Sequence, residues 1–457
     1  MNVLLVSYSF PPVGGVGVLR AASLARYLPQ HGIRLDVLTA RNPSAVGTDP
    51  ELLNDIPKGV TIHRTLTLDL PFGLKKWIKN RVTGARKPST STATSPQPRK
   101  PGLLRRIAQD ILLPDPQVTW LPILARAAAR IVRERNIDLV LITVPPFSSV
   151  LLAPKLRARF PNLAIVVDFR DEWLATSIDL ISFSRSPRAR QIAHQAEAAA
   201  VASATAVVAV TEAARRLLQA RYPDEPAGKF HLVPNGFDAA RLPRVLSQAQ
   251  AANDKPVLLT YLGTLYGSTE PQALIQAIRT LSEEIRSRLR VRFIGRVEDP
   301  YFRQSLLELG ETVELISFMP QAQALQALAE SDYALLITHD PVNVSAKFYD
   351  YLGVGKPIVA TVHPGGAVRS LIEELHAGWW ADSRDVNAIC KLLTDAVTKG
   401  GNLSETYRPD VERIATFERK SLAASYAGIL HGVRKKDSLP APMEPLATAV
   451  HAERSQR

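Results

Sequence analysis

Short runs of apolar and β-branched residues alternate with amphipathic helical stretches along most of this chain. Most of the runs are continuously apolar, which is typical of parallel strands that are buried on both faces of a sheet. They span residues 3–7, 35–39, 60–63, 138–143, 164–168, 206–210 and 230–233, and then 257–262, 291–294, 313–316, 333–337, 357–361 and 378–381. The pattern predicts an α/β fold with two open parallel sheets, joined by a polar, alanine-rich linker over residues 237–254.

Size and composition narrow the class of protein further. The chain has 457 residues, enough for two to three domains, and its 46% apolar and 22% charged residues exclude a disordered protein. The single cysteine, Cys390, excludes an intramolecular disulfide and fits a reducing cytoplasm. Residues 1–8 predict a strand and not a signal peptide, and no apolar run is long enough to span a membrane. We therefore expect a cytoplasmic protein, at most peripheral to a membrane.

One segment carries most of the net charge of +13. Residues 75–106 contain ten Lys and Arg side chains and no acidic residue, which leaves 13 − 10 = +3 for the rest of the chain. Because Trp77 and other bulky apolar residues lie among the cations, we expect an insertion over about 72–106 that contacts an anionic membrane surface. A solvated loop is the alternative. Nucleic-acid binding is not expected, because Ser, Thr and Pro interrupt the charges and no nucleic-acid-binding module is recognisable.

A glycine-rich turn follows the first predicted strand. Gly14 and Gly15 precede a helix whose first turn contains Arg20, so backbone N–H groups and a guanidinium could contact a phosphate there. A tight turn without a ligand is the alternative. A dinucleotide-binding fingerprint fits poorly, because the third glycine and the ribose-binding carboxylate are missing, which makes a nicotinamide-dependent enzyme a weak alternative.

Five ordered motifs together resemble one family. They are Pro-Pro-x-Gly-Gly-x-Gly-x-x-Arg at 11–20, Val-Pro-Pro-Phe-Ser at 144–148, Val-Asp-Phe-Arg-Asp-Glu-Trp at 167–173, Val-Pro-Asn-Gly-Phe-Asp at 233–238 and Ser-Ala-Lys-Phe-Tyr-Asp-Tyr-Leu-Gly-Val-Gly-Lys-Pro at 345–357. In this order they resemble glycosyltransferases of the GT-B architecture, similar to the retaining glycosyltransferase family 4 of surface-polysaccharide assembly. The resemblance implies two Rossmann-like domains that face a cleft. An acceptor domain would span 1–236 and a nucleotide-sugar domain 255–413, with a helix at 414–433 packed back on the first domain and a flexible tail at 434–457.

The last motif offers a donor site in the second domain. Ser345 is expected to be the N-cap of a helix whose N-terminus and Lys347 would contact the diphosphate of a nucleotide sugar. An exposed lysine is the alternative for Lys347. The resemblance implies that Asp350, where the family usually has Glu, contacts the ribose hydroxyls.

Other donor positions depart from the family pattern. Val342 stands where the family has a second carboxylate, and nearby Asp340 is a substitute candidate. The loop at 262–268 lacks the family's Arg and Lys, so that Gly263 and Thr264, with Arg296 at another strand end, are the remaining phosphate contacts. The resemblance also places the nucleobase near Phe318, for which a plain turn is the alternative.

The first domain offers acceptor and catalytic candidates. Arg170 and Asp171 follow the fifth strand, so they should emerge at the carboxyl edge of the sheet, where open α/β folds bind ligands. Asp171 could accept a hydroxyl proton or orient an acceptor, and a structural Arg170–Asp171 pair or an N-cap is the alternative. The scattered histidines predict no metal site, and no other cofactor is expected.

The resemblance implies a metal-independent enzyme that moves a sugar from a nucleoside diphosphate sugar to a saccharide or polyprenyl-linked acceptor, with retention. In that reaction the leaving phosphate can deprotonate the attacking hydroxyl, and the protein supplies orientation and diphosphate stabilisation. Two alternatives remain open. One is a nucleotide-sugar epimerase or hydrolase of the same fold, and the other is a non-catalytic assembly partner.

Overall fold

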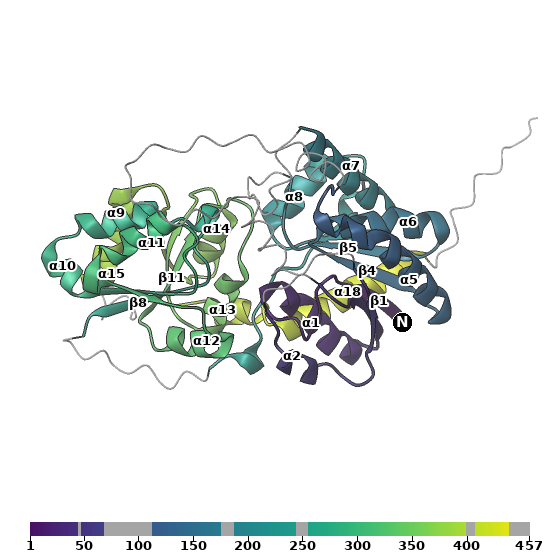
Figure 1. Ribbon diagram of the computed structural model, residues 1–457, viewed down its shortest axis with the longest axis horizontal. Coiled ribbons are helices and arrows are strands. Elements are labelled where there is room, and N and C mark those ends of the chain that lie inside the picture. The colour runs from purple at the N-terminus through teal and green to yellow at the C-terminus, as the bar shows by residue number, and fades with distance from the viewer. Residues whose placement is uncertain (44–46, 68–111, 175–186, 244–254, 399–406, 438–457) are drawn as a thin grey trace, which may run out of the picture.

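The computed structural model describes residues 1–43, 47–67, 112–174, 187–243, 255–398 and 407–437. Two parallel sheets form the cores of two domains, which confirms the α/β prediction (Figure 1). The predicted basic segment at 72–106, most of the linker and most of the tail lie outside the described residues. None of the described helices combines the length and the apolar character that a membrane span requires.

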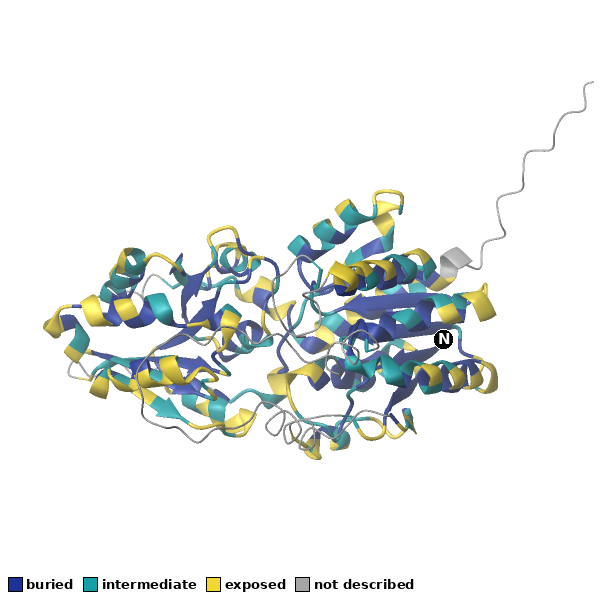
Figure 2. Cartoon of the chain, turned by 45° about the horizontal axis from the view of Figure 1, so that its top comes forward, coloured by how far each residue is buried: buried dark blue, intermediate teal, exposed yellow. Residues whose placement is uncertain are grey.

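The first domain is built on a seven-stranded sheet with the order β3-β2-β1-β4-β5-β6-β7. Its strands are β1 (Asn2–Val6), β2 (Arg34–Ala40), β3 (Thr61–Thr65), β4 (Leu139–Val144), β5 (Ala164–Phe169), β6 (Ala206–Ala209) and β7 (Phe230–Leu232). Its helices are α1 (Val16–Tyr27), α2 (Glu51–Asn54), α5 (Leu121–Glu134), α6 (Leu152–Arg159), α7 (Pro187–Ser203) and α8 (Glu212–Arg221). Strands β1, β4 and β5 are almost wholly buried, as their continuously apolar sequences predict (Figure 2).

The second domain has a six-stranded sheet with the order β10-β9-β8-β11-β12-β13. Its strands are β8 (Val257–Leu262), β9 (Leu289–Ile294), β10 (Val313–Ile316), β11 (Tyr333–Thr338), β12 (Ile358–Val362) and β13 (Gly378–Asp382). Its helices are α9 (Gln272–Thr280), α10 (Glu283–Ser287), α11 (Pro300–Leu307), α12 (Gln321–Ala329), α13 (Ala346–Val354), α14 (Ala367–Glu374), α15 (Val386–Thr398) and α17 (Val411–Ala415).

The topology predicts where ligands bind. Strand order reverses between β1 and β4 in the first sheet and between β8 and β11 in the second. Ligands of open α/β sheets bind beyond the carboxyl ends of the strands at such switch points. The loops that follow these four strands contain the glycine turn, the motif at 144–148, Gly263 and Asp340. The fold therefore gives both domains a ligand-binding edge made of the motif loops.

The chain crosses between the domains twice, and the two crossings pair with each other. The Phe237 N–H donates to the Phe417 carbonyl at 3.2 Å, and the Arg419 N–H donates to the Phe237 carbonyl at 2.9 Å. A Cβ on Gly236 would lie 2.0 Å from the Phe417 carbonyl oxygen, so a side chain there would break this pairing. We call residues 233–237 and 416–419 the hinge.

The helix predicted over residues 414–433 is interrupted at the hinge. The single helix expected over 414–433 is divided into α17 and α18 (Arg419–Asp437), because backbone groups at 417 and 419 bond to Phe237 across the hinge. Tyr426 and Leu430 of α18 are buried in the apolar cluster of the first domain that also contains Leu24 of α1. Helix α18 thus covers the same face of the first sheet as α1.

Candidate active site

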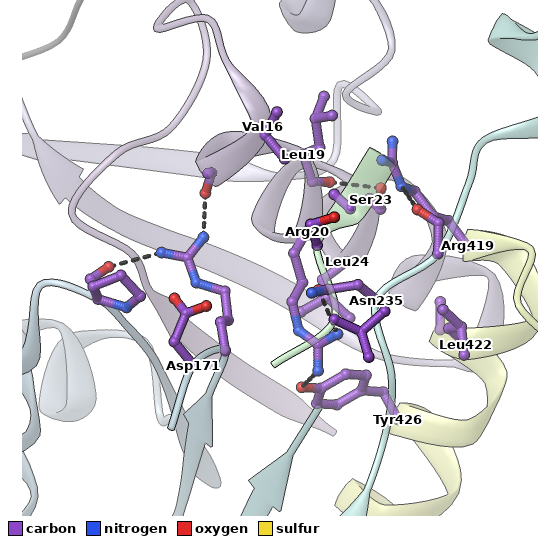
Figure 3. A pocket seen from close by; sticks show the side chains of 18 residues that line it. Val16, Leu19, Arg20, Ser23, Leu24, Asp171, Asn235, Arg419, Leu422 and Tyr426 are labelled. Atoms are coloured by element: carbon purple, nitrogen blue, oxygen red, sulfur yellow. Dashed lines mark hydrogen bonds between the residues drawn. The ribbon is translucent and has the colours of Figure 1, made fainter. Parts of the chain in front are cut away.

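A pocket of about 240 Å³ opens between the two domains (Figure 3). Its walls are the N-terminal half of α1, the ends of β4 and β5, the hinge, the start of α13 and the first half of α18. The predicted residues that line it are Arg20, Arg170, Asp171 and Ser345. The structure therefore brings candidates from both domains to one place.

Arg170 holds three loops of the first domain together. Its Nε donates to the Val144 carbonyl at 3.1 Å, its Nη2 donates to the Pro145 carbonyl at 2.8 Å, and its Nη1 donates to the Gly17 carbonyl. Burial lowers the pKa of Arg170, and the neighbouring carboxylates of Asp171 and Asp168 oppose that shift. The main role of this guanidinium is therefore to hold the pocket wall in place, and few of its donors remain free for a ligand.

Asp171 is the carboxylate of the first domain that faces the pocket. Burial raises its pKa, Arg170 opposes this, and the nearby Asp340 adds to it. Among the described residues, no group hydrogen-bonds to its carboxylate. Asp171 therefore has its oxygen atoms available for a substrate hydroxyl.

A buried charge cluster, which the sequence did not predict, supports the loop that contains Asp171. Nη2 of Arg221 donates to Oε1 of Glu172 at 2.6 Å, and Nη1 donates to Glu197. Glu197 also accepts from Nε1 of Trp173 at 2.6 Å, and the Trp173 ring stacks on Phe147 at 4.3 Å between ring centroids. No local pattern reveals this cluster, because its members are brought together from α7, α8 and the end of β5.

The loop after β11 joins the two domains next to Asp171. The Asn343 side chain accepts from the Glu172 N–H at 2.9 Å and donates to the Glu172 carbonyl at 3.4 Å. Val342, at the position where the family has a carboxylate, is 8% exposed and packs in an apolar cluster of the first domain. Val342 therefore makes an apolar contact between the two domains.

Asp340 is bound by its own loop. Its Oδ1 accepts from the N–H groups of Val342 and Asn343 at 2.8 and 3.0 Å, and its Oδ2 accepts from Nδ2 of Asn343 at 3.0 Å. The structure therefore explains Asp340 as an organiser of this loop, and not as the free carboxylate expected to replace the missing one.

The predicted phosphate contacts at the first glycine turn need correction. Arg20 donates to both oxygens of Asp168 at 3.0 and 3.1 Å, to the Val233 and Pro234 carbonyls at 2.7 Å each, and to the Tyr426 hydroxyl at 2.8 Å. These bonds use its guanidinium donors and join α1, β5, the hinge and α18. The Gly14 N–H donates to the Gly47 carbonyl at 3.0 Å, and Gly15 starts α1 with a φ of 99°. Neither Arg20 nor the Gly14 N–H is free for a phosphate.

Lys347 is the most unusual predicted donor residue. Its Nζ donates to the Tyr261 hydroxyl at 2.6 Å, and that hydroxyl in turn donates to the Thr264 carbonyl at 3.0 Å. Burial lowers the pKa of Lys347 to about 7. Among the described residues no carboxylate pairs with it. Desolvation of an ammonium without a counter-ion is costly, so an anionic ligand would complete this position.

Gly263 provides the space for that ammonium. Its φ of 114° is in the region that favours glycine, and a Cβ there would lie 3.2 Å from Nζ of Lys347. Lys347 thus reaches the carboxyl end of β8, where the family's phosphate-binding cations are missing. Ser345 occupies the N-cap position of α13 as predicted, but its side chain makes no capping hydrogen bond.

Three further donor candidates are Asp350, Arg296 and Phe318. The carboxylate of Asp350 accepts from Nε2 of Gln321 at 3.4 Å, and burial raises its pKa to about 6. The Arg296 guanidinium lies 5.8 Å from the ring centre of Phe318, which is 71% exposed. Such an exposed aromatic ring next to a cation can stack a nucleobase. No group of three or more potential metal ligands occurs within the described ranges.

Comparison with known proteins agrees with this architecture. The model of Glycosyltransferase Family 4 matches residues 13–241, and that of Glycosyl transferases group 1 matches residues 244–410. No curated protein matches the chain by sequence.

Solved structures show the same fold over nearly the full length. HepE of Anabaena in complex with UDP has 14% identity, a TM-score of 0.61, and coverage of 94% of this chain and 100% of HepE. Sucrose-phosphate synthase of Thermosynechococcus elongatus has 14% identity, a TM-score of 0.64, and coverage of 95% and 99%. WaaG, a glycosyltransferase involved in lipopolysaccharide biosynthesis, has 15% identity, a TM-score of 0.58, and coverage of 94% and 100%. The match over residues 13–241, half of the chain, together with the GT-B fold, shows that this protein belongs to glycosyltransferase family 4.

Proposed function

We propose that this glycosyltransferase moves a sugar from a nucleoside diphosphate sugar to a hydroxyl of a saccharide or lipid-linked acceptor, with retention, in surface-polysaccharide or glycolipid synthesis. The observation that carries the donor part is the partly buried Lys347, which has no carboxylate partner among the described residues, at the switch point of the second sheet. The solved complexes of HepE with UDP and with UDP-glucose support a uridine nucleotide as the first donor to test. The involvement of WaaG in lipopolysaccharide biosynthesis supports the acceptor class.

We assign the diphosphate, the ribose and the base of the donor to three neighbouring sets of residues. The diphosphate lies beside Lys347, Gly263 and the N-terminus of α13, where partial positive charge favours anions. The ribose contacts Asp350 and the base stacks on Phe318, next to Arg296. This order places the sugar toward the domain interface and Asp171.

The transfer step forms a bond between the acceptor oxygen and C1 of the sugar, and it breaks the bond between C1 and the diphosphate oxygen. The proton of the attacking hydroxyl passes to the leaving phosphate, so no protein nucleophile is required. Lys347 stabilises the negative charge that develops on the diphosphate. Asp171 orients the acceptor hydroxyl through a hydrogen bond to its free carboxylate.

A panel of nucleoside diphosphates tests the donor assignment. We expect the matching diphosphate to raise the melting temperature, because it binds only the folded chain, and adenosine to leave it unchanged. Incubation of the matching nucleotide sugar with a lipid extract should then give labelled lipid. Release of free sugar without an acceptor would support the hydrolase alternative, and the absence of a response to every nucleotide would contradict the proposal.

Replacing Asp171 by Asn should lower kcat by about 10²-fold while the donor KM changes little, since the carboxylate contacts the acceptor in the transition state. Glu308→Gln is a suitable control, because Glu308 is an exposed carboxylate of the second domain, with 51% side-chain exposure. Initial rates at saturating donor measure the effect. A D171N enzyme with unchanged kcat and unchanged acceptor KM would remove Asp171 from the mechanism.

A further inference from the structure

Arg419, which belongs to none of the sequence motifs, lines the interdomain pocket at the hinge. It is the first residue of α18 and only 9% exposed. Its Nε donates to the Gly236 carbonyl at 3.1 Å, and its backbone N–H donates to Phe237. These two bonds fix the position of the residue but use one of the five side-chain donors.

The other four donors of Arg419 have no protein partner in the described part of the chain. Ser149 Oγ is the one fully buried side-chain polar atom without a hydrogen bond among the described residues. Because Nη1 and Nη2 of Arg419 are unpaired and are not among such fully buried atoms, they are accessible, and they reach the open space of the pocket. Arg419 thus presents a guanidinium fork to a ligand.

The charge of Arg419 is not neutralised by contact within the described part of the chain. Burial lowers its pKa, and the carboxylates of Asp350 and Asp238 oppose this from a distance without an ion pair to Arg419. Asp238 is already paired with Arg26 at 3.2 Å, and Asp350 accepts from Gln321. Because a buried charge without a partner is unfavourable, an anion at this position would stabilise the pocket.

Two further features of the pocket suit an oxyanion. Ser345 and Ala346, at the start of α13, line the same pocket as Arg419, and a helix start carries partial positive charge. Figure 3 shows Asp171 and Arg419 at opposite ends of the pocket, so the Asp171 carboxylate does not oppose an anion at Arg419.

We propose that the Arg419 end of this pocket binds one phosphate group, with Nη1 and Nη2 of Arg419 donating to two of its oxygens. A planar fork matches a phosphate in this two-point manner, which a lysine cannot reproduce. The site is separate from the Lys347 position, because Lys347 does not line the pocket and its Nζ turns toward Tyr261 and Gly263.

The proposal rests on the proposed function, because the bound phosphate group would belong to a substrate of the sugar transfer. That substrate is either the donor diphosphate or an acceptor that carries a phosphate. In the second case the acceptor phosphate would lie at Arg419 and its reacting hydroxyl near Asp171, on the other side of the pocket in Figure 3.

Titration with inorganic phosphate tests the site in full-length protein. We use a Lys347→Met background, so that the Lys347 position does not contribute, and compare it with Lys347→Met/Arg419→Gln. We expect the second substitution to weaken phosphate binding at least roughly tenfold, as for the loss of a charge-assisted bidentate contact. Lys420→Gln is the matched control, since Lys420 is the exposed neighbour of Arg419 on α18, and it should leave phosphate binding unchanged.

Two substitutions of Arg419 separate the loss of phosphate contacts from damage to the hinge. The glutamine introduced by Arg419→Gln can still donate to the Gly236 carbonyl, and Arg419→Lys keeps the charge but should recover only part of the affinity. Equal phosphate affinity with and without Arg419→Gln would overturn the proposal. The Arg419→Gln substitution alone, with Lys347 kept, distinguishes the two sources of the phosphate. Weaker nucleotide-sugar binding would identify the donor as the source, whereas a raised acceptor KM alone would identify the acceptor. Failure of the proposed function is distinguishable, because it would appear as a wild-type protein that binds no nucleotide.

Discussion

The Lys347→Met variant should lose about 10²–10³-fold in kcat and should bind nucleotide sugars much more weakly than the wild type, because removal of one preorganised donor to a developing negative charge has an effect of this size. Lys347 provides the ammonium next to Gly263, where the family's phosphate-binding Arg and Lys are missing. Isothermal titration with a nucleotide sugar and initial-rate kinetics measure the two losses.

The stability of this variant separates a binding role from a structural one. Lys347 is partly buried and has no carboxylate partner among the described residues, so methionine removes an unfavourable charge and should leave the melting temperature unchanged or higher. Lys391→Met, at an exposed position of α15, is the control. Wild-type nucleotide-sugar affinity in the K347M protein would contradict the assignment of Lys347.

The pH dependence of donor binding should report the same residue. Burial lowers the pKa of free Lys347 from 10.5 to about 7, whereas a bound diphosphate favours the charged form and raises it. Above pH 7 donor binding must therefore take up a proton, and donor affinity should fall as the pH rises. In the unliganded protein the unfolded state binds more protons between about pH 7 and 10.5, so this residue makes stability increase with pH there. The affinity slope should be absent in K347M.

The Arg20→Met variant should be destabilised by about 3–5 kcal/mol, which is the usual cost of leaving a buried charge unpaired. Asp168 is fully buried and accepts two hydrogen bonds from Arg20. The same guanidinium joins Val233 and Pro234 of the hinge to Tyr426 of α18. The melting temperature of the first domain should fall by roughly 10 °C.

A second substitution identifies the cause. Arg20→Met/Asp168→Asn removes both charges and should recover part of the lost stability, because the unpaired carboxylate no longer needs to be buried. An R20M protein with wild-type stability and a specific loss of donor affinity would instead return Arg20 to the phosphate-binding role that the glycine turn suggests.

The sequence was sufficient for the parts of the fold that depend on local pattern. Runs such as 139–144 and 164–169 are continuously apolar, and the structure buries them as neighbouring parallel strands. The motif loops were predicted at the sheet edges because a residue that follows a parallel strand must lie at its carboxyl end. Ser345 was predicted as the N-cap of a helix, and the structure has it at that position of α13, with Lys347 in the first turn.

Long-range contacts could not be predicted from one sequence. Arg20 follows a glycine turn, which suggests a phosphate contact, but its partners include residues more than 200 positions away in the hinge and α18. Val342 gives no sign that it packs on the opposite domain, and Arg419 gives no sign that the hinge leaves its guanidinium donors free. These positions are decided by how the two domains and α18 meet.

A crystal structure of the protein with a bound nucleotide sugar would show whether Lys347 and α13 hold the donor. We expect diphosphate oxygens within hydrogen-bonding distance of Nζ of Lys347 and beside the first turn of α13, with the ribose at Asp350 and the base on Phe318. A diphosphate bound away from α13, with Nζ of Lys347 still bonded only to the Tyr261 hydroxyl, would contradict it.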